Sequence, residues 1–389
     1  MTQAKTITGK DPQRGVAVEI TYGRTILAIR DVGDDPVRNL PVIAPGFIDG
    51  QVNGYGGCDL NAEDVTPGTV GRITSMLSRI GVTTWVPTIV TAPEDAITHA
   101  LEQISQACKD DPASRTAIPC VHIEGPFISD QDGPRGVHNA DYVRGLDAEE
   151  VQRWLRASGM VGIVTVSPHA LDAPEQIAKI RELGVEVAIG HTHASPAQIR
   201  AAIASGARLA THLGNGIATT LPRHPNPLWT QLADDRLSAG LIADGHHLPT
   251  DTLKVMIRAK TTERAYLVSD STALAGSEPG RHRTSVGGVV DLSPEGRLSY
   301  VGTDLLAGAA ATLPDGFRNV IRNVGLNIAE ALTMVTSTPA RVIPGTRPGL
   351  GQLRVGAPAD LVLITGEGPE AGTITKVVQS GREVSGAAA

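Results

Sequence analysis

The chain has 389 residues and a formal charge of −7, with 34 Lys and Arg against 41 Asp and Glu. This mildly acidic balance, without a basic run, argues against a DNA- or RNA-binding protein. Hydrophobic residues make up 41% and charged residues 19%, which is typical of a folded chain and argues against disorder. At roughly 100–200 residues per domain, the length allows two or three domains, or one large α/β barrel with an appendage.

The N-terminus, the cysteines and the apolar runs indicate a cellular compartment. The opening MTQAKTITGK lacks the apolar core of a secretory signal, and no window approaches the ~18 continuous apolar residues of a membrane span. Cys58, Cys108 and Cys120 form neither an even framework nor a CxxC motif. We therefore expect a cytoplasmic protein without membrane or nucleic-acid partners.

From about residue 43, short apolar runs alternate with amphipathic helical stretches. Several of these stretches have Pro at or just before their first turn, a normal helix start. Eight such strand–helix units predict a (β/α)8 TIM-type barrel covered by helices. The predicted strands are 43–49, 83–88, 118–124, 162–167, 185–191, 208–212, 239–244 and 265–270, and the clearest helices are 93–108, 174–183, 196–205 and 250–259.

Both ends of the chain have a different pattern, with short β-like runs between turn residues. We expect residues 1–44 and 345–389 to build one small β-sandwich-like domain beside a catalytic barrel of residues 45–344. Two short runs around a Pro-Glu-Gly turn predict a hairpin insertion at about 277–303, after the eighth strand.

Polar residues gather at the carboxyl ends of the predicted strands, the edge where such barrels carry their reacting groups. Glu124, His191, His212 and Asp270 each end a different strand. Imidazole and carboxylate suit a borderline divalent ion such as Zn²⁺, and three protein ligands leave one position open for water. A single His at a strand end is more often structural, but four suitable strand ends together predict metal chemistry.

Several motifs, taken in order, resemble those of N-acetylglucosamine-6-phosphate deacetylases. The resemblance spans nearly the whole chain, and HIEGPF with ATHL and IADG is its most specific part. The tail GQLRVGAPADLVLI resembles the closing β-segment of the amidohydrolase superfamily. The motifs are PGFIDGQVNGYGG (45–57), HIEGPF (122–127), GVHNADYV (136–143), GHT (190–192), ATHLGN (210–215), IADGHH (242–247) and VSDS (268–271).

The resemblance implies a metal-dependent barrel that hydrolyses the acetamide of an amino-sugar phosphate. It implies that Glu124, His191 and His212 hold one divalent ion, with Zn²⁺ expected. It also implies that Asp270 acts first as general base and then as general acid. His138 would orient the substrate carbonyl or a sugar hydroxyl.

The same resemblance implies residues for substrate binding and an oligomeric state. Asn215 and His247 would contact the substrate, in the family at its phosphate end, and Gly216 would also bind the substrate. Arg223 would meet the anionic substrate across the interface of a homodimer; otherwise it is a solvated loop charge.

Gln51-Val-Asn53 stands where many superfamily members have His-x-His after the first strand. Amides are poor ligands for a second ion, so we expect one metal, with Gln51 near the substrate and at most a weak or water-mediated ligand. The fourth predicted strand, 162–167, has no Lys, which argues against the carbamylated-lysine two-metal type. His122 and His193 would support the ligands from behind, although His193 could also face the site.

The sequence departs from the family pattern around the sugar and phosphate. Gly214, Gly216 and Ile217 replace a usual aromatic and Ala-Met, which predicts a roomier pocket wall or a more mobile loop. Asp304 stands in a stretch that the family fills with small residues, and near a phosphate it would cost about 1 kcal/mol or more if partly buried.

The expected reaction converts N-acetylglucosamine 6-phosphate to glucosamine 6-phosphate and acetate. A first alternative is a deacetylase of another N-acyl amino sugar or N-acyl amine, possibly without phosphate. A second is a non-catalytic barrel that binds a small molecule without metal or turnover.

Overall fold

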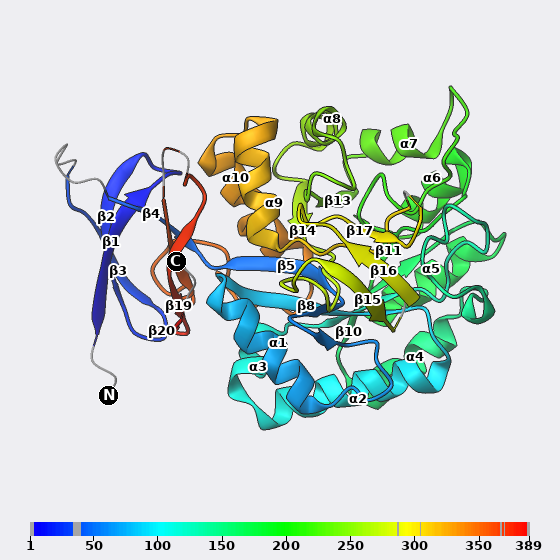
Figure 1. The fold of residues 1–389 in the computed structure, drawn as a ribbon, viewed down its shortest axis with the longest axis horizontal. Helices are drawn as coiled ribbons and strands as arrows, with labels where there is room; N and C mark the ends of the chain where they lie inside the picture. Colours follow the sequence, from blue (N-terminus) through cyan, green and yellow to red (C-terminus); the bar gives the residue numbers. More distant parts are fainter. Residues whose placement is uncertain are drawn as a thin grey trace.

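The computed structural model describes residues 4–33, 40–285, 288–303, 305–365, 368 and 370–386. Its largest sheet has eight parallel strands, each beside its predecessor in the chain, which confirms the predicted TIM-type barrel (Figure 1). The strands are β5 (Phe47–Val52), β8 (Val82–Val90), β9 (Val121–Glu124), β10 (Val161–Val166), β11 (Glu186–Ile189), β12 (Leu209–Ala210), β13 (Ser238–Ile242) and β14 (Ala265–Val268).

Hydrogen bonds beyond the strand ends join the first and last strands of the barrel. The Asp270 amide donates to the Gln51 carbonyl at 3.0 Å, and the Asn53 amide donates to the Ser271 carbonyl at 2.9 Å. All residues of β5, β8 and β10 are buried, as expected for strands covered by helices outside and by side chains inside.

Helices follow the strands around the outside of the barrel (Figure 1). Thr66 and Ser195 cap two of them with capping boxes, and Pro occupies the first helical turn of both. The covering helices are α1 (Pro67–Arg79), α2 (Glu94–Asp110), α3 (Pro112–Ala117), α4 (Ala148–Ser158), α5 (Ala173–Glu182), α6 (Pro196–Ala204), α7 (Pro227–Ala233) and α8 (Thr250–Lys260), followed after β14 by α9 (Leu313–Asn319), the π-helix Val320–Val324, α10 (Ile328–Val335) and α11 (Ser337–Val342).

A second sheet combines strands from both ends of the chain and lies at one end of the molecule (Figure 1). The predicted strand 43–49 is wrong in its bounds, because residues 42–45 pair in this sheet and the barrel strand begins only at Phe47. Where the two domains divide stays a prediction. The strands of this sheet are β1 (Lys5–Asp11), β2 (Val16–Tyr22), β3 (Ile26–Asp31), β4 (Val42–Pro45), β18 (Leu361–Ile364), β19 (Ile374–Gln379) and β20 (Arg382–Glu383).

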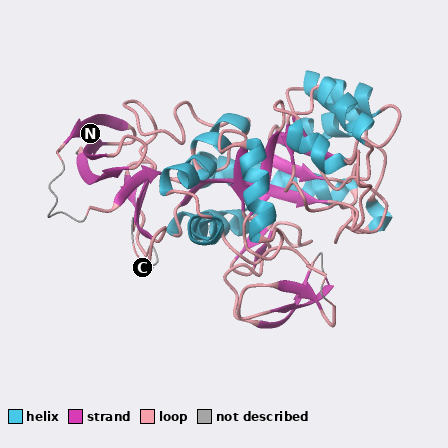
Figure 2. Ribbon diagram, turned by 90° about the horizontal axis from the view of Figure 1, so that it is seen from above, coloured by secondary structure: helices cyan, strands magenta, loops and turns pink. Residues whose placement is uncertain are grey.

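A small antiparallel sheet follows β14 and projects from the barrel (Figure 2). It comprises β15 (Gly280–Thr284), β16 (Gly288–Leu292) and β17 (Leu298–Tyr300), and its apolar side chains pack in a cluster of their own. A two-stranded ladder, β6 (Gly54–Tyr55) and β7 (Cys58–Asp59), leaves the end of β5. Among the described helices, none has the length and apolar character to cross a membrane.

Candidate metal centre and active-site cavity

Four polar side chains stand at the carboxyl ends of barrel strands. Glu124 ends β9, and His191, His212 and Asp270 each follow a strand by two residues. His191, His212 and Asp270 have positive φ angles of 46°, 26° and 52°. This left-handed backbone is uncommon for residues other than glycine and is typical of functional sites, where the surrounding structure holds it in place.

The Glu124 carboxylate meets two imidazoles inside the barrel mouth. Its Oε1 lies 3.2 Å from Nε2 of His191 and 2.8 Å from Nε2 of His212, and these two nitrogens are 3.1 Å apart. All three residues are buried. The three predicted ligands therefore present their donor atoms to a common centre.

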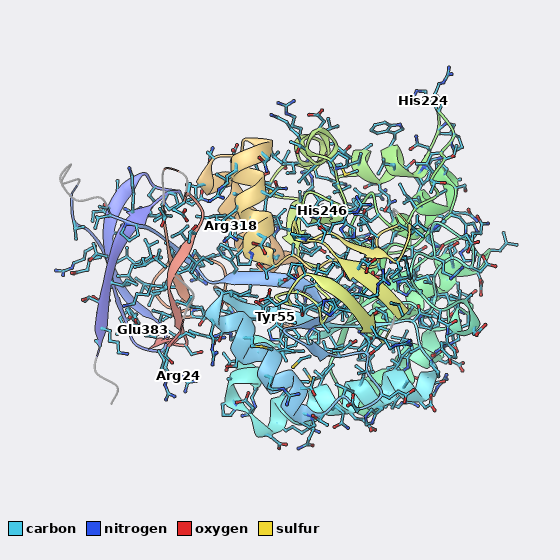
Figure 3. All side chains as sticks on the ribbon, viewed as in Figure 1. Arg24, Tyr55, His224, His246, Arg318 and Glu383 are labelled. Carbon is cyan, nitrogen blue, oxygen red and sulfur yellow. The ribbon has the colours of Figure 1, made fainter. Side chains whose placement is uncertain are left out.

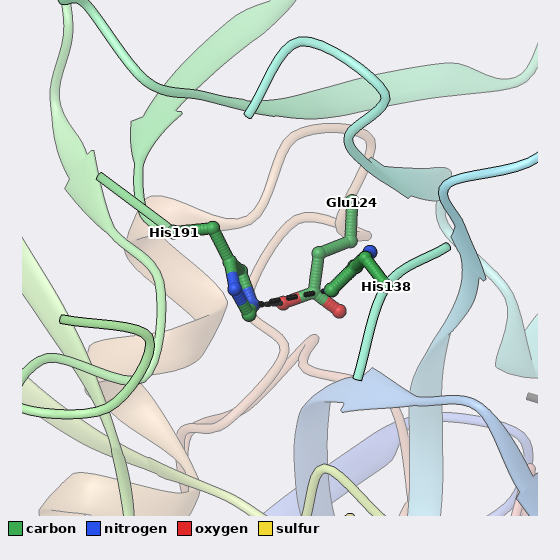
Figure 4. Close-up of side chains that lie close together, drawn as sticks. All are labelled: Glu124, His138 and His191. Carbon is green, nitrogen blue, oxygen red and sulfur yellow. Dashed lines mark hydrogen bonds and ion pairs between the residues drawn. The ribbon is translucent and has the colours of Figure 1, made fainter. Parts of the chain in front are cut away.

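His138 is a further candidate ligand. Its Nε2 lies 3.3 Å from Nε2 of His191, and its Nδ1 lies 2.9 Å from the hydroxyl of Thr91. Glu124, His138 and His191 offer donor atoms within 4.8 Å of one another (Figure 4). The sequence predicted a substrate-orienting role for His138, and its position is compatible with either role.

The hydrogen bond behind His191 decides which ring nitrogen can bind a metal. Nδ1 lies 2.8 Å from the Pro134 carbonyl, which can only accept, so Nδ1 carries the proton. In the neutral ring, Nε2 then turns its lone pair toward the Glu124 carboxylate. One carboxylate oxygen and several imidazole Nε2 atoms around one centre suit a divalent ion such as Zn²⁺.

The pKa values show that this cluster attracts positive charge. Burial opposes ionisation of Glu124, but the adjacent imidazoles of His191 and His212 hold the pKa of its carboxyl well below the usual range. Burial also disfavours a charge on His212, yet Glu124 raises the pKa of that imidazole to about 9. Burial lowers the pKa of His138 to about 3, so that ring is neutral at physiological pH.

Asp270 lines the same cavity, and the pKa of its carboxyl lies close to neutral pH. Burial and the charge of Glu124 raise the pKa of Asp270 to about 6. The Asn53 side-chain amide donates to its Oδ1 at 2.8 Å. A carboxyl group with such a pKa can both accept and release a proton near pH 7, as a general base and acid must.

The cavity has a volume of about 230 Å³. Three predicted substrate residues, Asn215, Gly216 and His247, belong to its walls. None of the described residues in its lining is a Lys or Arg. The other polar side chains of the lining are Asn53, Asp59, Asn61, Glu124, His138, His191, His212, Asp270, Thr272 and Thr284.

His247 is held by Asp244, a residue to which the sequence assigned no role. The two carboxylate oxygens of Asp244 accept from the His247 amide at 2.9 Å and pair with its Nδ1 at 2.6 Å. Burial opposes ionisation of Asp244, but the bond to His247 lowers its pKa to about 2. The neighbouring His246 instead bonds the Glu295 carbonyl at 3.0 Å, away from the cavity.

Gly216 packs directly against the ring of His191. A Cβ atom at this position would lie 2.9 Å from Nδ1 of His191, and its φ of +58° also favours glycine. Gly214 is not part of the cavity lining, and a Cβ there would lie 2.7 Å from Cε of Met256. Asp304, the other departure of interest, is outside the described residues.

Gln51 and Arg223 lie outside the cavity lining. Gln51 is buried, and its Nε2 has no hydrogen-bond partner among the described residues. Arg223 is exposed on the loop before α7. His224, the next residue, projects at the outer edge of the molecule (Figure 3).

His122 and His193 lie near the candidate metal ligands, but each bonds another residue through a ring nitrogen. Nε2 of His122 bonds Thr165 at 2.7 Å inside the barrel, and burial lowers the pKa of His122 to about 4. Nδ1 of His193 lies 2.6 Å from the Ser129 hydroxyl. The Ser129 amide donates to the carbonyl of His191, so His193 supports that ligand indirectly.

The chain is similar over most of its length to amide-hydrolysing enzymes. A model of the amidohydrolase family matches residues 42–384. N-acetylglucosamine-6-phosphate deacetylase of Bos taurus is 33% identical over 335 residues, which cover 83% of this chain and 79% of that protein. N-acetylgalactosamine-6-phosphate deacetylase of Escherichia coli O157:H7 is 30% identical over 328 residues, which cover 84% of each chain.

A solved structure has the same fold along the whole chain. It is an Asp-to-Ala mutant of N-acetyl-D-glucosamine-6-phosphate deacetylase from Mycobacterium smegmatis, in complex with N-acetyl-D-glucosamine 6-phosphate. It is 26% identical to this chain, with a TM-score of 0.84, and the match covers 98% of this chain and 99% of that one. The resemblance stated from the motifs is thereby confirmed.

Proposed function

The chain belongs to the amidohydrolase family, and we propose that it hydrolyses the acetamide of N-acetylglucosamine 6-phosphate to acetate and glucosamine 6-phosphate. One observation carries the proposal. Glu124, His191 and His212 bring Oε1 and two Nε2 atoms within 3.2 Å of one another, in the cavity that Asp270 also lines.

The donor set fits one divalent metal ion, with Zn²⁺ as our proposal. Glu124, His191 and His212 would hold it, since the lone pair of His191 Nε2 already faces the Glu124 carboxylate. Such an ion lowers the pKa of a water molecule toward ~7 and polarises a carbonyl group.

Asp270 moves the protons of the reaction. Its pKa of about 6 leaves it largely ionised at neutral pH, ready to accept a proton from the attacking water. It then returns this proton to the amide nitrogen, so that the sugar leaves as an amine rather than as its anion. Proton transfer of this kind typically contributes 10²–10⁴-fold to the rate.

His138, Asn215 and His247 bind and orient the substrate. His138 is neutral and lies beside His191, where it can direct the acetyl carbonyl. Nδ2 of Asn215 is buried without a partner among the described residues and can donate to a sugar or phosphate oxygen. Asp244 fixes the ring of His247 at another wall of the cavity.

The phosphate of this substrate needs a cation from outside the single chain, because the described lining contains no Lys or Arg. We propose that a second copy of the chain supplies Arg223 from its exposed loop, which makes the enzyme a homodimer. Arg223→Ala should then raise KM for phosphorylated substrates at least about 10-fold, with little effect on kcat.

The same lining supports a second candidate, a deacetylase of a non-phosphorylated N-acyl amino sugar or amine. Asp59 contributes a carboxylate to the wall. A neutral or cationic substrate would avoid repulsion from this group.

A substrate panel tests these proposals. N-acetylglucosamine 6-phosphate, N-acetylgalactosamine 6-phosphate and free N-acetylglucosamine are assayed with metal-depleted protein reloaded with Zn²⁺, Co²⁺ or Mn²⁺. We expect kcat/KM for the first sugar to exceed that of the free sugar by at least about 100-fold. Equal rates would favour the second candidate, and ligand binding without metal or turnover would favour a non-catalytic barrel.

A further inference from the structure

Asn53 stands beside Asp270 at the closure of the barrel. Its Nδ2 lies 2.8 Å from Oδ1 of Asp270 and 3.4 Å from the backbone carbonyl of the same residue. Both contacts are acceptors, so the amide nitrogen and not the amide oxygen must face Asp270. The orientation of the Asn53 side chain is therefore fixed by chemistry.

Backbone hydrogen bonds fix the position of the main chain at Asn53 and at Asp270. The Asn53 amide donates to the Ser271 carbonyl at 2.9 Å, and the Asp270 amide donates to the Gln51 carbonyl at 3.0 Å. Asp270 also has a φ of +52°, which turns the chain sharply after β14. Asn53 and Asp270 thus lie on two hydrogen-bonded segments whose separation cannot change without opening the barrel.

The other side of the amide has no hydrogen bond. Oδ1 of Asn53 is buried and finds no partner among the described residues. A buried polar atom without a partner destabilises a protein by about 1–3 kcal/mol. An asparagine that served stability alone would use both its amide nitrogen and its amide oxygen in hydrogen bonds. Asn53 uses its nitrogen, and both of its side-chain hydrogen bonds go to Asp270.

We propose that Asn53 is a positioning residue that holds Oδ1 of Asp270, so that Oδ2 alone exchanges protons with the reacting groups. The inference rests on the proposed function, in which Asp270 moves the protons. A fixed carboxylate has one oxygen in place for the water and for the leaving nitrogen, and an amide donor is suited to hold it because it does not titrate.

Substitutions at Asn53 test this role. Asn53→Ala removes the donor, and Asn53→Asp keeps the shape but sets an acceptor against Oδ1. We expect both to lower kcat for N-acetylglucosamine 6-phosphate about 100-fold, with KM within about 3-fold and bound metal unchanged. With the N-trifluoroacetyl analogue, whose carbonyl is attacked more easily, the loss of kcat should shrink to less than about 10-fold.

Asn61 provides a matched control, because it lines the same cavity but serves the backbone. Its Oδ1 accepts from the Val90 amide at 2.8 Å, and its Nδ2 donates to the Thr88 carbonyl at 3.2 Å. Asn61→Ala should therefore lower the melting temperature more than Asn53→Ala does, and its kcat loss should be the same for both substrates.

Asp270→Asn, measured in parallel, separates the possible failures. If Asp270→Asn is inactive while both Asn53 variants keep kcat within about 3-fold, this inference is overturned and the proposed function stands. A kcat loss at Asn53 that follows loss of metal or of melting temperature also overturns it. An active Asp270→Asn enzyme removes Asp270 from the mechanism and overturns this inference, whereas a wild-type enzyme without turnover of N-acetylglucosamine 6-phosphate overturns the proposed function.

Discussion

The Nδ1 atom of His191 donates to the carbonyl of Pro134 at 2.8 Å, and this bond leaves Nε2 free to face Glu124. Pro134 lies in the loop after β9, and that loop also carries Ser129, whose amide donates to the His191 carbonyl. The same loop thus fixes both the ring and the backbone of His191. The orientation of this ligand depends on main-chain groups, and a search for polar side chains would not have found them.

Asp270→Asn should leave the metal content near that of the wild type but reduce turnover by several orders of magnitude. The asparagine keeps the size of the side chain and an oxygen acceptor for Asn53, but it cannot carry a proton between water and nitrogen. Metal analysis and steady-state kinetics on the same samples check this. Retention of more than a tenth of the activity would remove Asp270 from the mechanism.

His212 and His138 compete for the place of third metal ligand, and substitutions separate them. We expect His212→Ala to lose most of the metal, because Glu124 lies 2.8 Å from this ring. His138→Ala should keep the metal and lose about 10²-fold or more in kcat, since the proposed role of His138 is to direct the carbonyl. Metal loss in His138→Ala but not in His212→Ala would make His138 the third metal ligand and His212 the residue that directs the carbonyl.

The order of the barrel strands could be predicted from the sequence, because short apolar runs alternate with helical stretches and each run is followed closely by a polar residue. Glu124, His191, His212 and Asp270 emerged in this way, and the structure gathers them at one mouth. Strand 43–49 could not be divided from sequence alone. The apolar runs on both sides of Pro45 look alike, although one pairs with β18 and the other with β8.

Hydrogen-bond partners far apart in the chain could not be predicted, because no local sequence pattern indicates them. Asn53 and Asp270 are separated by 217 positions, and Thr91 and His138 by 47. Gln51 was expected near the substrate because it stands where many superfamily members have a histidine, but it is buried and is not among the residues of the cavity lining. Only Asp244 had a local cue, because it precedes His247 by three residues in a tight turn.

Gly216→Ala should weaken metal binding. The added Cβ would lie 2.9 Å from Nδ1 of His191, and the positive φ strains any other residue by roughly 1–2 kcal/mol. We expect a fall in metal affinity of about 10-fold or more, measured by competition with a chelator. Gly184→Ala is the control, because its φ is +81° but nothing lies within 4 Å of its added Cβ. Equal effects on metal affinity in both variants would rule out contact with His191 as the cause.

Asp244→Asn should raise KM rather than lower kcat. Asparagine can still bond the His247 amide, but it no longer pairs a negative charge with Nδ1 of that ring. His247 then turns more freely in the cavity wall and binds the substrate less well. We expect KM to rise about 10-fold with kcat within about 3-fold. A matching fall in kcat at saturating substrate would place Asp244 in the chemistry instead.

We expect Lys260 to make a pH-dependent contribution to the free energy of unfolding at alkaline pH. This fully buried side chain donates from Nζ to the carbonyls of Asp234 at 2.7 Å and Leu237 at 3.0 Å, and burial lowers its pKa from 10.5 to about 8. Between pH 8 and pH 10.5 the unfolded chain keeps a proton that the folded chain has released. The free energy of unfolding therefore gains on the order of 1–3 kcal/mol from this residue as the pH rises through that window.

Lys260→Met removes the titration, so the wild type should become more stable relative to the variant between pH 8 and pH 10.5. Urea unfolding at several pH values and constant metal concentration measures this difference, and taking a difference cancels the other groups that titrate in alkali. Lys109→Met, at an exposed position on α2, should show a difference independent of pH. If the stability difference between the wild type and Lys260→Met is also independent of pH, Lys260 is charged at pH 9. Its two carbonyl partners then offset the cost of its burial.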